Sequence, residues 1–106
     1  MRHEINFTSE AQDDLIEIYK FVAINDSFDK AENLFNEIYE TCVSLKDFPN
    51  RGQNPPELFD MKEDFLEIHY KPYRIIYTVS KNVVFVNCII DGRRNVQELL
   101  RERLLK

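Results

Sequence analysis

The chain has 106 residues, of which 43% are hydrophobic and 31% are charged, and its formal net charge is −5. This length favours one domain over residues 1–106, and the composition excludes a disordered chain. No apolar run approaches the ~18 residues of a membrane span, and the first residues contain no apolar signal core. A cytoplasmic location without membrane contact is therefore expected.

The negative charge is unevenly distributed along the chain. Residues 1–50 carry 11 acidic and 4 basic side chains, whereas residues 51–106 carry 8 acidic and 10 basic ones. Because a net negative chain attracts nucleic acid poorly, we expect no sequence-specific nucleic-acid binding by this chain alone. An anionic partner should meet the C-terminal half, where the basic residues gather: Lys71, Arg74, Lys81, Arg93, Arg94, Arg101, Arg103 and Lys106.

The N-terminal half predicts a strand followed by two helices. Residues 3–8 alternate as a strand does, and Ser9 with Gln12 forms a capping-box pattern that opens a helix ending near residue 24. Residues 25–27 break this pattern and supply a new N-cap. The apolar stripe of a second helix follows, and the tight connection predicts an antiparallel hairpin. This stripe consists of Phe28, Ala31, Leu34, Phe35, Ile38, Cys42 and Leu45.

The C-terminal half predicts a loop, three strands and a helix. Residues 47–58 contain three of the four prolines and one of the two glycines, which is loop composition. Residues 65–70, 73–79 and 83–90 are typical of strands, and their short connections predict an antiparallel meander. The last of these runs is almost continuously apolar, as a central strand is. Residues 95–106 return to helical spacing.

The resulting β-α-α-β-β-β-α order predicts an α+β fold, in which the N-terminal strand and helical hairpin pack on a small antiparallel sheet. With the helices on one face, the opposite face should be at least partly free. Strand alternation places Arg74, Ile76 and Thr78 on one side of the second meander strand. Because this row contains the polar members, we expect it to be the exposed one.

The cysteines and histidines offer little chemistry. Cys42 and Cys88 lie in apolar contexts and are interpreted as buried free thiols, with a disulfide or a metal pair as the less favoured alternative. His3 and His69 are isolated and have no metal-ligand spacing. We therefore expect neither a metal site nor a cofactor.

Three phrases occur in order along the chain: "LKDFP" at residues 45–49, "YRIIY" at 73–77 and "DGRRN" at 91–95. Together they resemble the RelE/ParE toxin superfamily, and within it the ParE-like, or plasmid-stabilisation, branch. The resemblance covers almost the whole chain. It implies the toxin of a type II toxin–antitoxin system, neutralised by a cognate antitoxin with which it forms an oligomer. RelE-type members cut messenger RNA on the ribosome, whereas ParE-type members are associated with poisoning DNA gyrase.

The residues favour the ParE-like interpretation. Cleavage of RNA through its 2′-hydroxyl needs a base, an acid and cations that stabilise the phosphate. Where the RelE pattern places Arg, His and Tyr, this chain has Leu66, Asp91 and about Leu100. We therefore assign no catalytic residue and expect gyrase inhibition by protein binding. Two alternatives stay open: a RelE-like ribosome-dependent mRNA interferase that uses His69, Arg74 and Arg94, and a decayed toxin that only binds antitoxin.

Five residues are the candidates for contact with the antitoxin or the target: Arg74, Arg93, Arg94, Leu100 and Arg101. Their mixture of basic and apolar side chains suits an acidic, apolar partner segment lying on the exposed sheet row and the last helix. Of the adjacent pair, one arginine should bind an acid of its own chain, either Asp91 or Glu57, and the other should project towards a partner. A turn with two solvated charges is the alternative.

Overall fold

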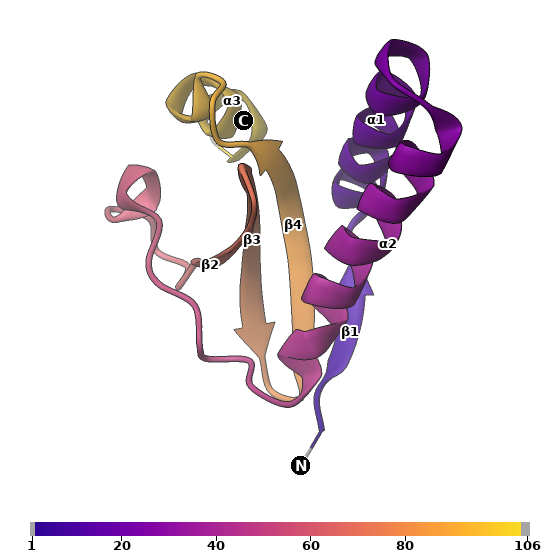
Figure 1. Ribbon diagram of the computed structural model, residues 1–106. Coiled ribbons are helices and arrows are strands. Elements are labelled where there is room, and N and C mark those ends of the chain that lie inside the picture. Colours follow the sequence, from indigo (N-terminus) through magenta and orange to yellow (C-terminus); the bar gives the residue numbers. More distant parts are fainter. Residues whose placement is uncertain (1, 105–106) are drawn as a thin grey trace.

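The computed structural model describes residues 2–104 and confirms the β-α-α-β-β-β-α order. Two short 3₁₀ turns, η1 and η2, lie in the segment between the second helix and the second strand (Figure 1). Residues 105 and 106, at the end of the expected last helix, lie outside the described residues. The elements are β1 (Glu4–Phe7), α1 (Ser9–Asn25), α2 (Phe28–Val43), η1 (Ser44–Lys46), η2 (Pro56–Leu58), β2 (Leu66–Tyr70), β3 (Tyr73–Ser80), β4 (Val83–Asp91) and α3 (Val96–Leu104).

The four strands form one sheet in the order β1-β4-β3-β2. Strands β2, β3 and β4 make the expected antiparallel meander, and β4 is central as its apolar sequence predicts. Strand β1 adds to β4 in parallel, with Glu4 opposite Val83 and Phe7 opposite Val86, so the sheet is mixed and not purely antiparallel. Residues 8–82 separate β1 from β4, and this long connection allows the parallel pairing, which a short turn could not make.

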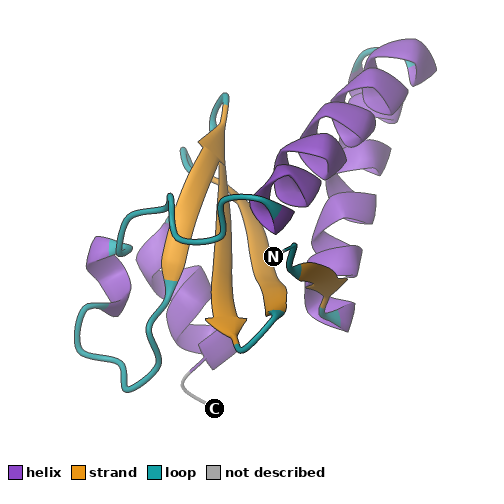
Figure 2. Cartoon of the chain, turned by 90° about the horizontal axis from the view of Figure 1, so that it is seen from below, coloured by secondary structure: helices purple, strands orange, loops and turns teal. Residues whose placement is uncertain are grey.

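Helices lie on both faces of the sheet, so the face that was expected to be at least partly free is covered in part. The α1–α2 hairpin lies on one face, and α3 with the loop before β2 lies on the other (Figures 1 and 2). Ile76 has no exposed surface because Leu58, Val96 and Leu100 pack around it. The prediction that the row of Arg74 and Ile76 is exposed is therefore wrong. A helix was expected over residues 95–106, where α3 lies, but its apolar stripe did not reveal which face of the sheet it covers.

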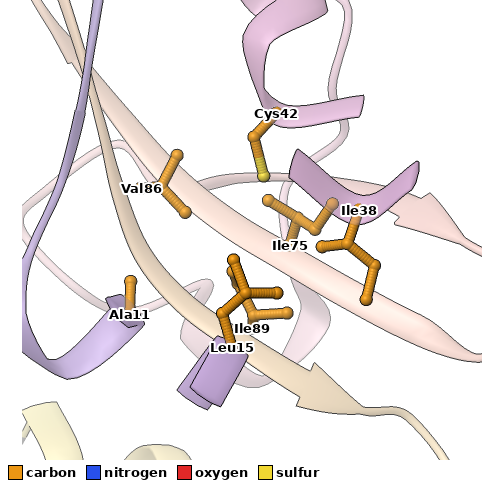
Figure 3. Close-up of a cluster of buried hydrophobic side chains, with 7 residues drawn as sticks. All are labelled: Ala11, Leu15, Ile38, Cys42, Ile75, Val86 and Ile89. Carbon is orange, nitrogen blue, oxygen red and sulfur yellow. The ribbon is translucent and has the colours of Figure 1, made fainter. Parts of the chain in front are cut away.

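The hairpin face holds the main core cluster, drawn in Figure 3. Its members come from both helices and the two middle strands of the sheet: Ala11, Leu15, Ile38, Cys42, Ile75, Val86 and Ile89. Cys88 belongs to the cluster on the other face. Both cysteines are buried and free, as expected, and they lie on opposite sides of the sheet. Burial raises the pKa of the Cys42 thiol to about 12 and that of Cys88 to about 11, so both stay protonated at neutral pH.

The helix starts agree with the sequence at α2 but differ at α1. Ser27 caps α2 by accepting a hydrogen bond from the Lys30 N–H, as its position predicts. At α1 the cap is Thr8 and not Ser9, because the Thr8 hydroxyl oxygen accepts from the Ala11 N–H at 3.1 Å. Thr8 also binds β4 through its own N–H to the Val86 carbonyl. Because this hydrogen bond attaches Thr8 to the sheet, Thr8 caps the helix in place of Ser9.

A buried tyrosine explains two of the three family-like phrases. The Tyr77 hydroxyl donates to the Pro49 carbonyl at 2.7 Å and accepts from the Gly52 N–H at 3.1 Å. Tyr77 itself has no exposed surface and packs against Leu45 and Val84. The second tyrosine of "YRIIY" therefore fixes the loop that follows "LKDFP".

The edge of β4 that β1 leaves unpaired is closed by a side chain. The pairing of β1 with β4 ends at Phe7, and farther along this edge the Asp14 carboxylate on α1 accepts the Ile89 N–H at 2.9 Å. Arg103 from α3 donates to the same carboxylate and lies 3.0 Å from the Glu10 carboxylate. Asp14 and Arg103 are both largely buried. This ion pair, which the sequence did not reveal, ties α1, β4 and α3 together.

The Asp14 carboxyl should make stability depend on pH. Burial raises its pKa from 3.8 to about 6, although the Ile89 N–H and Arg103 oppose this shift. Because the pKa is higher in the folded than in the unfolded state, the folded protein binds this proton more tightly. The resulting stabilisation is complete below about pH 4 and is lost as the pH rises through 6.

We expect the free energy of unfolding of Asp14→Asn, measured by urea titration, to change less between about pH 4 and pH 6 than that of the wild type. The matched control is Asp13→Asn, since Asp13 is the exposed neighbour on the same helix. This control should keep the wild-type dependence. A slope equal to the wild-type slope in Asp14→Asn would contradict the assignment.

Candidate functional site

Arg74, at the start of β3, is bound by two carboxylates. It donates to Glu67 at 2.6 and 3.0 Å and to Glu57 at 2.8 and 2.7 Å. The three side chains are largely buried, at 14% exposure for Arg74, 8% for Glu67 and 19% for Glu57. The hydrogen bonds from Arg74 lower the pKa of Glu57, and those same bonds raise the pKa of Arg74 above its ordinary value. Glu57 and Arg74 are therefore ionised at neutral pH.

The charge balance of this cluster decides what Arg74 can bind. One guanidinium faces two carboxylates, so the cluster carries an excess negative charge. An incoming phosphate would meet this charge in a partly buried site, where screening by water is weak. Arg74 therefore stabilises its own chain and offers no free positive charge. The sequence suggested Glu57 as a partner for Arg93 or Arg94, but Glu57 binds Arg74.

His69 belongs to the same cluster. It lies opposite Arg74 in the β2–β3 pairing, and its Nε2 is 3.3 Å from a Glu67 oxygen. Its side chain is 61% exposed and borders an open hollow of about 310 Å³ together with Arg51 and Gln53. The structure thus brings together two of the three alternative nuclease residues, His69 and Arg74, but it does so around a carboxylate.

The turn after β4 separates the two adjacent arginines. Arg93 donates from Nε and Nη2 to the Asp91 carboxylate at 3.0 and 2.8 Å, while the Arg94 N–H binds the Asp91 carbonyl. These bonds lower the pKa of Asp91. The prediction that one arginine pairs with Asp91 is confirmed. Arg94 is exposed, and it forms no ion pair with another residue between 2 and 104.

Gly92 places this turn directly on Arg74. Its N–H donates to the Pro72 carbonyl at 2.7 Å. A Cβ at this position would lie 2.9 Å from the same oxygen and 3.2 Å from the Arg74 Cδ, so only glycine fits. The turn and the Arg74 cluster therefore form one corner of the molecule.

Helix α3 contributes the remaining candidates to this corner. Arg101 is exposed and borders a small groove of about 110 Å³, of which Glu57 forms another wall. Leu100 is only 1% exposed and belongs to the core beneath α3. The expected direct contact of Leu100 with a partner is therefore not available in this arrangement. Arg94 and Arg101 are the two candidates whose side chains reach solvent without a carboxylate partner among the described residues.

The two arginines of the turn should give unlike variants. Arg93→Ala removes the side chain that binds Asp91, so we expect a small fall in Tm, because exposed ion pairs contribute little. Arg94→Ala should leave Tm unchanged in the same calorimetric scan. Affinity for the partner should fall in Arg94→Ala only. If both variants matched the wild type in Tm and partner affinity, the turn would be a solvated one without a binding role.

Two general properties of the described residues bear on function. Between residues 2 and 104 no group of three His, Cys, Asp or Glu side chains is arranged to hold a metal ion. No helix in this part of the chain has both the length and the apolar character needed to cross a bilayer.

Comparison with known proteins identifies the family. A model of the ParE toxin of type II toxin–antitoxin systems (parDE) matches residues 5–96. The chain belongs to the ParE toxin family. A solved chain described as the chromosomal ParDE toxin–antitoxin system from P. aeruginosa superposes with a TM-score of 0.72 at 18% identity, over 85% of this chain and 96% of that one. A search of curated protein sequences finds no match.

Family membership makes the chain a toxin of the type II class, and it confirms the resemblance that the three phrases suggested. The similarity to the P. aeruginosa chain shows that the ParE toxin shares that chain's fold. The match reaches residue 96, so it contains β1 to β4, the Arg74 cluster and the turn with Arg93 and Arg94. Helix α3 lies almost entirely beyond it.

Proposed function

We propose that this ParE toxin acts by binding DNA gyrase, without cutting RNA, and that a cognate antitoxin neutralises it in the cytoplasm as a toxin–antitoxin oligomer. The observation that carries this proposal is the state of Arg74. Its four hydrogen bonds to Glu57 and Glu67 occupy the side chain best placed to hold a phosphate. A nuclease of this fold would need that positive charge to be free.

The surroundings of Arg74 support the same proposal. The Nε2 of His69, the candidate base, lies 3.3 Å from a Glu67 oxygen that also binds Arg74. Asp91 puts a third acid at the corner, after Glu57 and Glu67, and it binds Arg93. The exposed arginines, Arg94 and Arg101, remain, but two cations alone supply neither the base nor the acid that 2′-hydroxyl chemistry requires.

The antitoxin is proposed to bind at this corner. The sheet row of Ile76 does not offer the expected surface, because Val96 and Leu100 of α3 and Leu58 of η2 cover Ile76. Arg94 and Arg101 provide exposed positive charge, and the half-buried Leu99 adds apolar surface on α3. An acidic, apolar antitoxin segment complements both features.

The experiment compares two activities of one purified toxin sample. The toxin should inhibit DNA supercoiling by purified gyrase and should leave messenger RNA intact, with and without ribosomes. Addition of the neighbour-encoded antitoxin should abolish the inhibition. Site-specific cuts in ribosome-bound messages, lost in His69→Ala or Arg94→Ala, would establish the mRNA interferase instead. Antitoxin binding with neither activity would indicate a decayed toxin.

The antitoxin surface has its own test. Arg94→Ala/Arg101→Ala should weaken antitoxin binding in calorimetric titration, by about 10-fold or more for two exposed charges in one interface. The matched control is Lys20→Ala/Lys30→Ala, which removes two exposed cations from the α1–α2 hairpin. If the two double variants bound the antitoxin with equal affinity, the corner would not be the antitoxin-binding surface.

A further inference from the structure

The turn end of the α1–α2 hairpin projects beyond the sheet (Figure 1). No residue from 16 to 30 is buried, although this stretch contains the ends of two helices. Ile16 is 45% exposed, and the three large apolar side chains nearest the turn are more exposed: Phe21 at 67%, Ile24 at 82% and Phe28 at 71%. We call these three residues the hairpin tip. Phe28 was expected in the core stripe of α2, and its exposure contradicts that expectation.

Residues other than the tip make the contacts of the hairpin core. The helices contact each other through the edge-to-face rings of Tyr19 and Phe35, and they meet the sheet through residues farther from the turn, such as Leu15 and Ile38. Clustered apolar side chains on a small protein are unfavourable in water unless a partner covers them. Aromatic residues within such a cluster are the type that dominates binding energy in protein interfaces.

The charge of the hairpin helices indicates the kind of partner. Residues 9–43 contain nine acidic and two basic side chains, a net charge of −7, whereas the rest of the chain is net positive. Glu10 and Asp14, at the end of the hairpin far from the turn, are paired with Arg103. One of the two lysines, Lys30, is paired with Asp26 at 3.2 Å. A second copy of the hairpin and an anionic lipid surface would both be repelled. The complementary partner is a basic protein surface with an apolar recess.

We propose that the hairpin tip is the surface by which the toxin docks on its target, and that the docking site is a basic surface of gyrase of the kind that contacts DNA. This inference rests on the proposed function. Surfaces that bind the phosphate backbone are rich in Lys and Arg, so an enzyme that acts on DNA presents one. The acidic helices are attracted to that surface, and Phe21, Ile24 and Phe28 fill its recess.

The arrangement separates two binding surfaces by charge. The hairpin and the antitoxin corner lie on opposite sides of the sheet (Figure 1). The corner presents Arg94 and Arg101 to an acidic partner, and the hairpin presents its carboxylates to a basic one. A variant of the tip should therefore affect the target and spare the antitoxin.

The test uses the full-length toxin and a triple variant, Phe21→Ala/Ile24→Ala/Phe28→Ala. Alanine removes the apolar surface and keeps the helix propensity. The matched control is Phe48→Ala/Phe59→Ala, which removes two equally exposed phenylalanines outside the hairpin, at 69% and 83% exposure. Binding to purified gyrase and to the antitoxin is measured by biolayer interferometry, and Tm is measured alongside.

We expect the triple variant to bind gyrase about 100-fold more weakly, as the loss of several interface anchors implies. Its antitoxin affinity and Tm should equal those of the wild type, and the control should match the wild type throughout. A second variant, Glu17→Gln/Glu32→Gln, keeps the tip and removes two exposed carboxylates. It should bind gyrase with a lower association rate that depends less on salt.

Each of the other possible outcomes contradicts the inference and shows which part of it fails. If the wild type binds gyrase and the triple variant binds equally well, the tip is not the docking surface, while the proposed function stands. If the wild type does not bind gyrase at all, both fail. Loss of antitoxin affinity in the triple variant would assign the tip to the antitoxin. Tip-dependent dimers in sedimentation, or tip-dependent binding to phosphatidylglycerol vesicles, would likewise replace the proposed partner.

Discussion

Arg74→Ala is expected to lower the free energy of unfolding by about 3 kcal/mol, because it leaves two largely buried carboxylates without their counter-ion. Glu67 is 8% exposed and loses two hydrogen bonds from Arg74, while Glu57 loses the other two. Arg74→Lys should be nearly as harmful, since an ammonium group cannot bind both carboxylates in the planar geometry of a guanidinium. Urea unfolding monitored by circular dichroism measures the effect.

The control for Arg74→Ala is Arg93→Ala, which breaks an exposed ion pair at the same corner. A rescue variant tests whether the unpaired carboxylates cause the loss of stability. Replacing the whole cluster with apolar residues, Arg74→Met/Glu57→Leu/Glu67→Leu, should recover most of the lost stability, because no unpaired charge remains. If Arg74→Ala unfolded at the wild-type urea concentration, the cluster would have no structural role, and Arg74 would again be a candidate phosphate ligand.

Gly52→Ala is expected to be comparably destabilising, by about 3 kcal/mol, since overpacking and loss of a buried hydrogen bond combine. A Cβ on residue 52 would lie 2.6 Å from the Tyr77 hydroxyl oxygen and 2.8 Å from the Glu67 carbonyl oxygen. Neither atom can retreat easily, because Tyr77 is fully buried and the carbonyl belongs to β2. Thermal unfolding in a calorimeter provides the measurement.

A double-mutant cycle separates the two contributions to this effect. Tyr77→Phe removes the hydroxyl that binds Pro49 and Gly52, so it should cost about 1–3 kcal/mol by itself. In the Tyr77→Phe background, Gly52→Ala should be less harmful, because the closest atom is gone. Strict additivity would mean that the Glu67 backbone alone causes the clash. Phe48→Ala, an exposed change in the same loop, serves as the control.

These contacts show what the family-like phrases do in this chain. The hydrogen bond between Tyr77 and Pro49 joins the loop before β2 to the sheet. Gly92 lets the turn after β4 pass close to Arg74, because a side chain at this position would clash. The phrases are therefore mainly determinants of the fold. This explains why they identify the family well and discriminate its activities poorly. The side chains that reach solvent, such as Arg94 at the corner and Phe21 at the hairpin tip, carry the proposed differences in partner.

The sequence by itself determined the order of the elements, the position of the central strand and the burial of both cysteines. Each of these follows from local periodicity or from a long apolar run, as in residues 83–90. It also offered Asp91, beside Glu57, as the acid that would hold one of the two arginines, because an acid two residues from Arg93 is close in a tight turn. The family could be recognised from the sequence for the same reason, because each of its three phrases lies within one short stretch of the chain.

Only the tertiary structure decided which surfaces are free. Whether Ile76 or Phe28 is buried depends on where α3 and the hairpin turn lie, and helical or strand periodicity assigns a residue to a face without saying what covers that face. The pairing of Arg74 with Glu57 and Glu67, and of Asp14 with Arg103, joins residues from separate elements. Such long-range ion pairs depend on strand register and helix packing, which leave no pattern in the sequence around either partner.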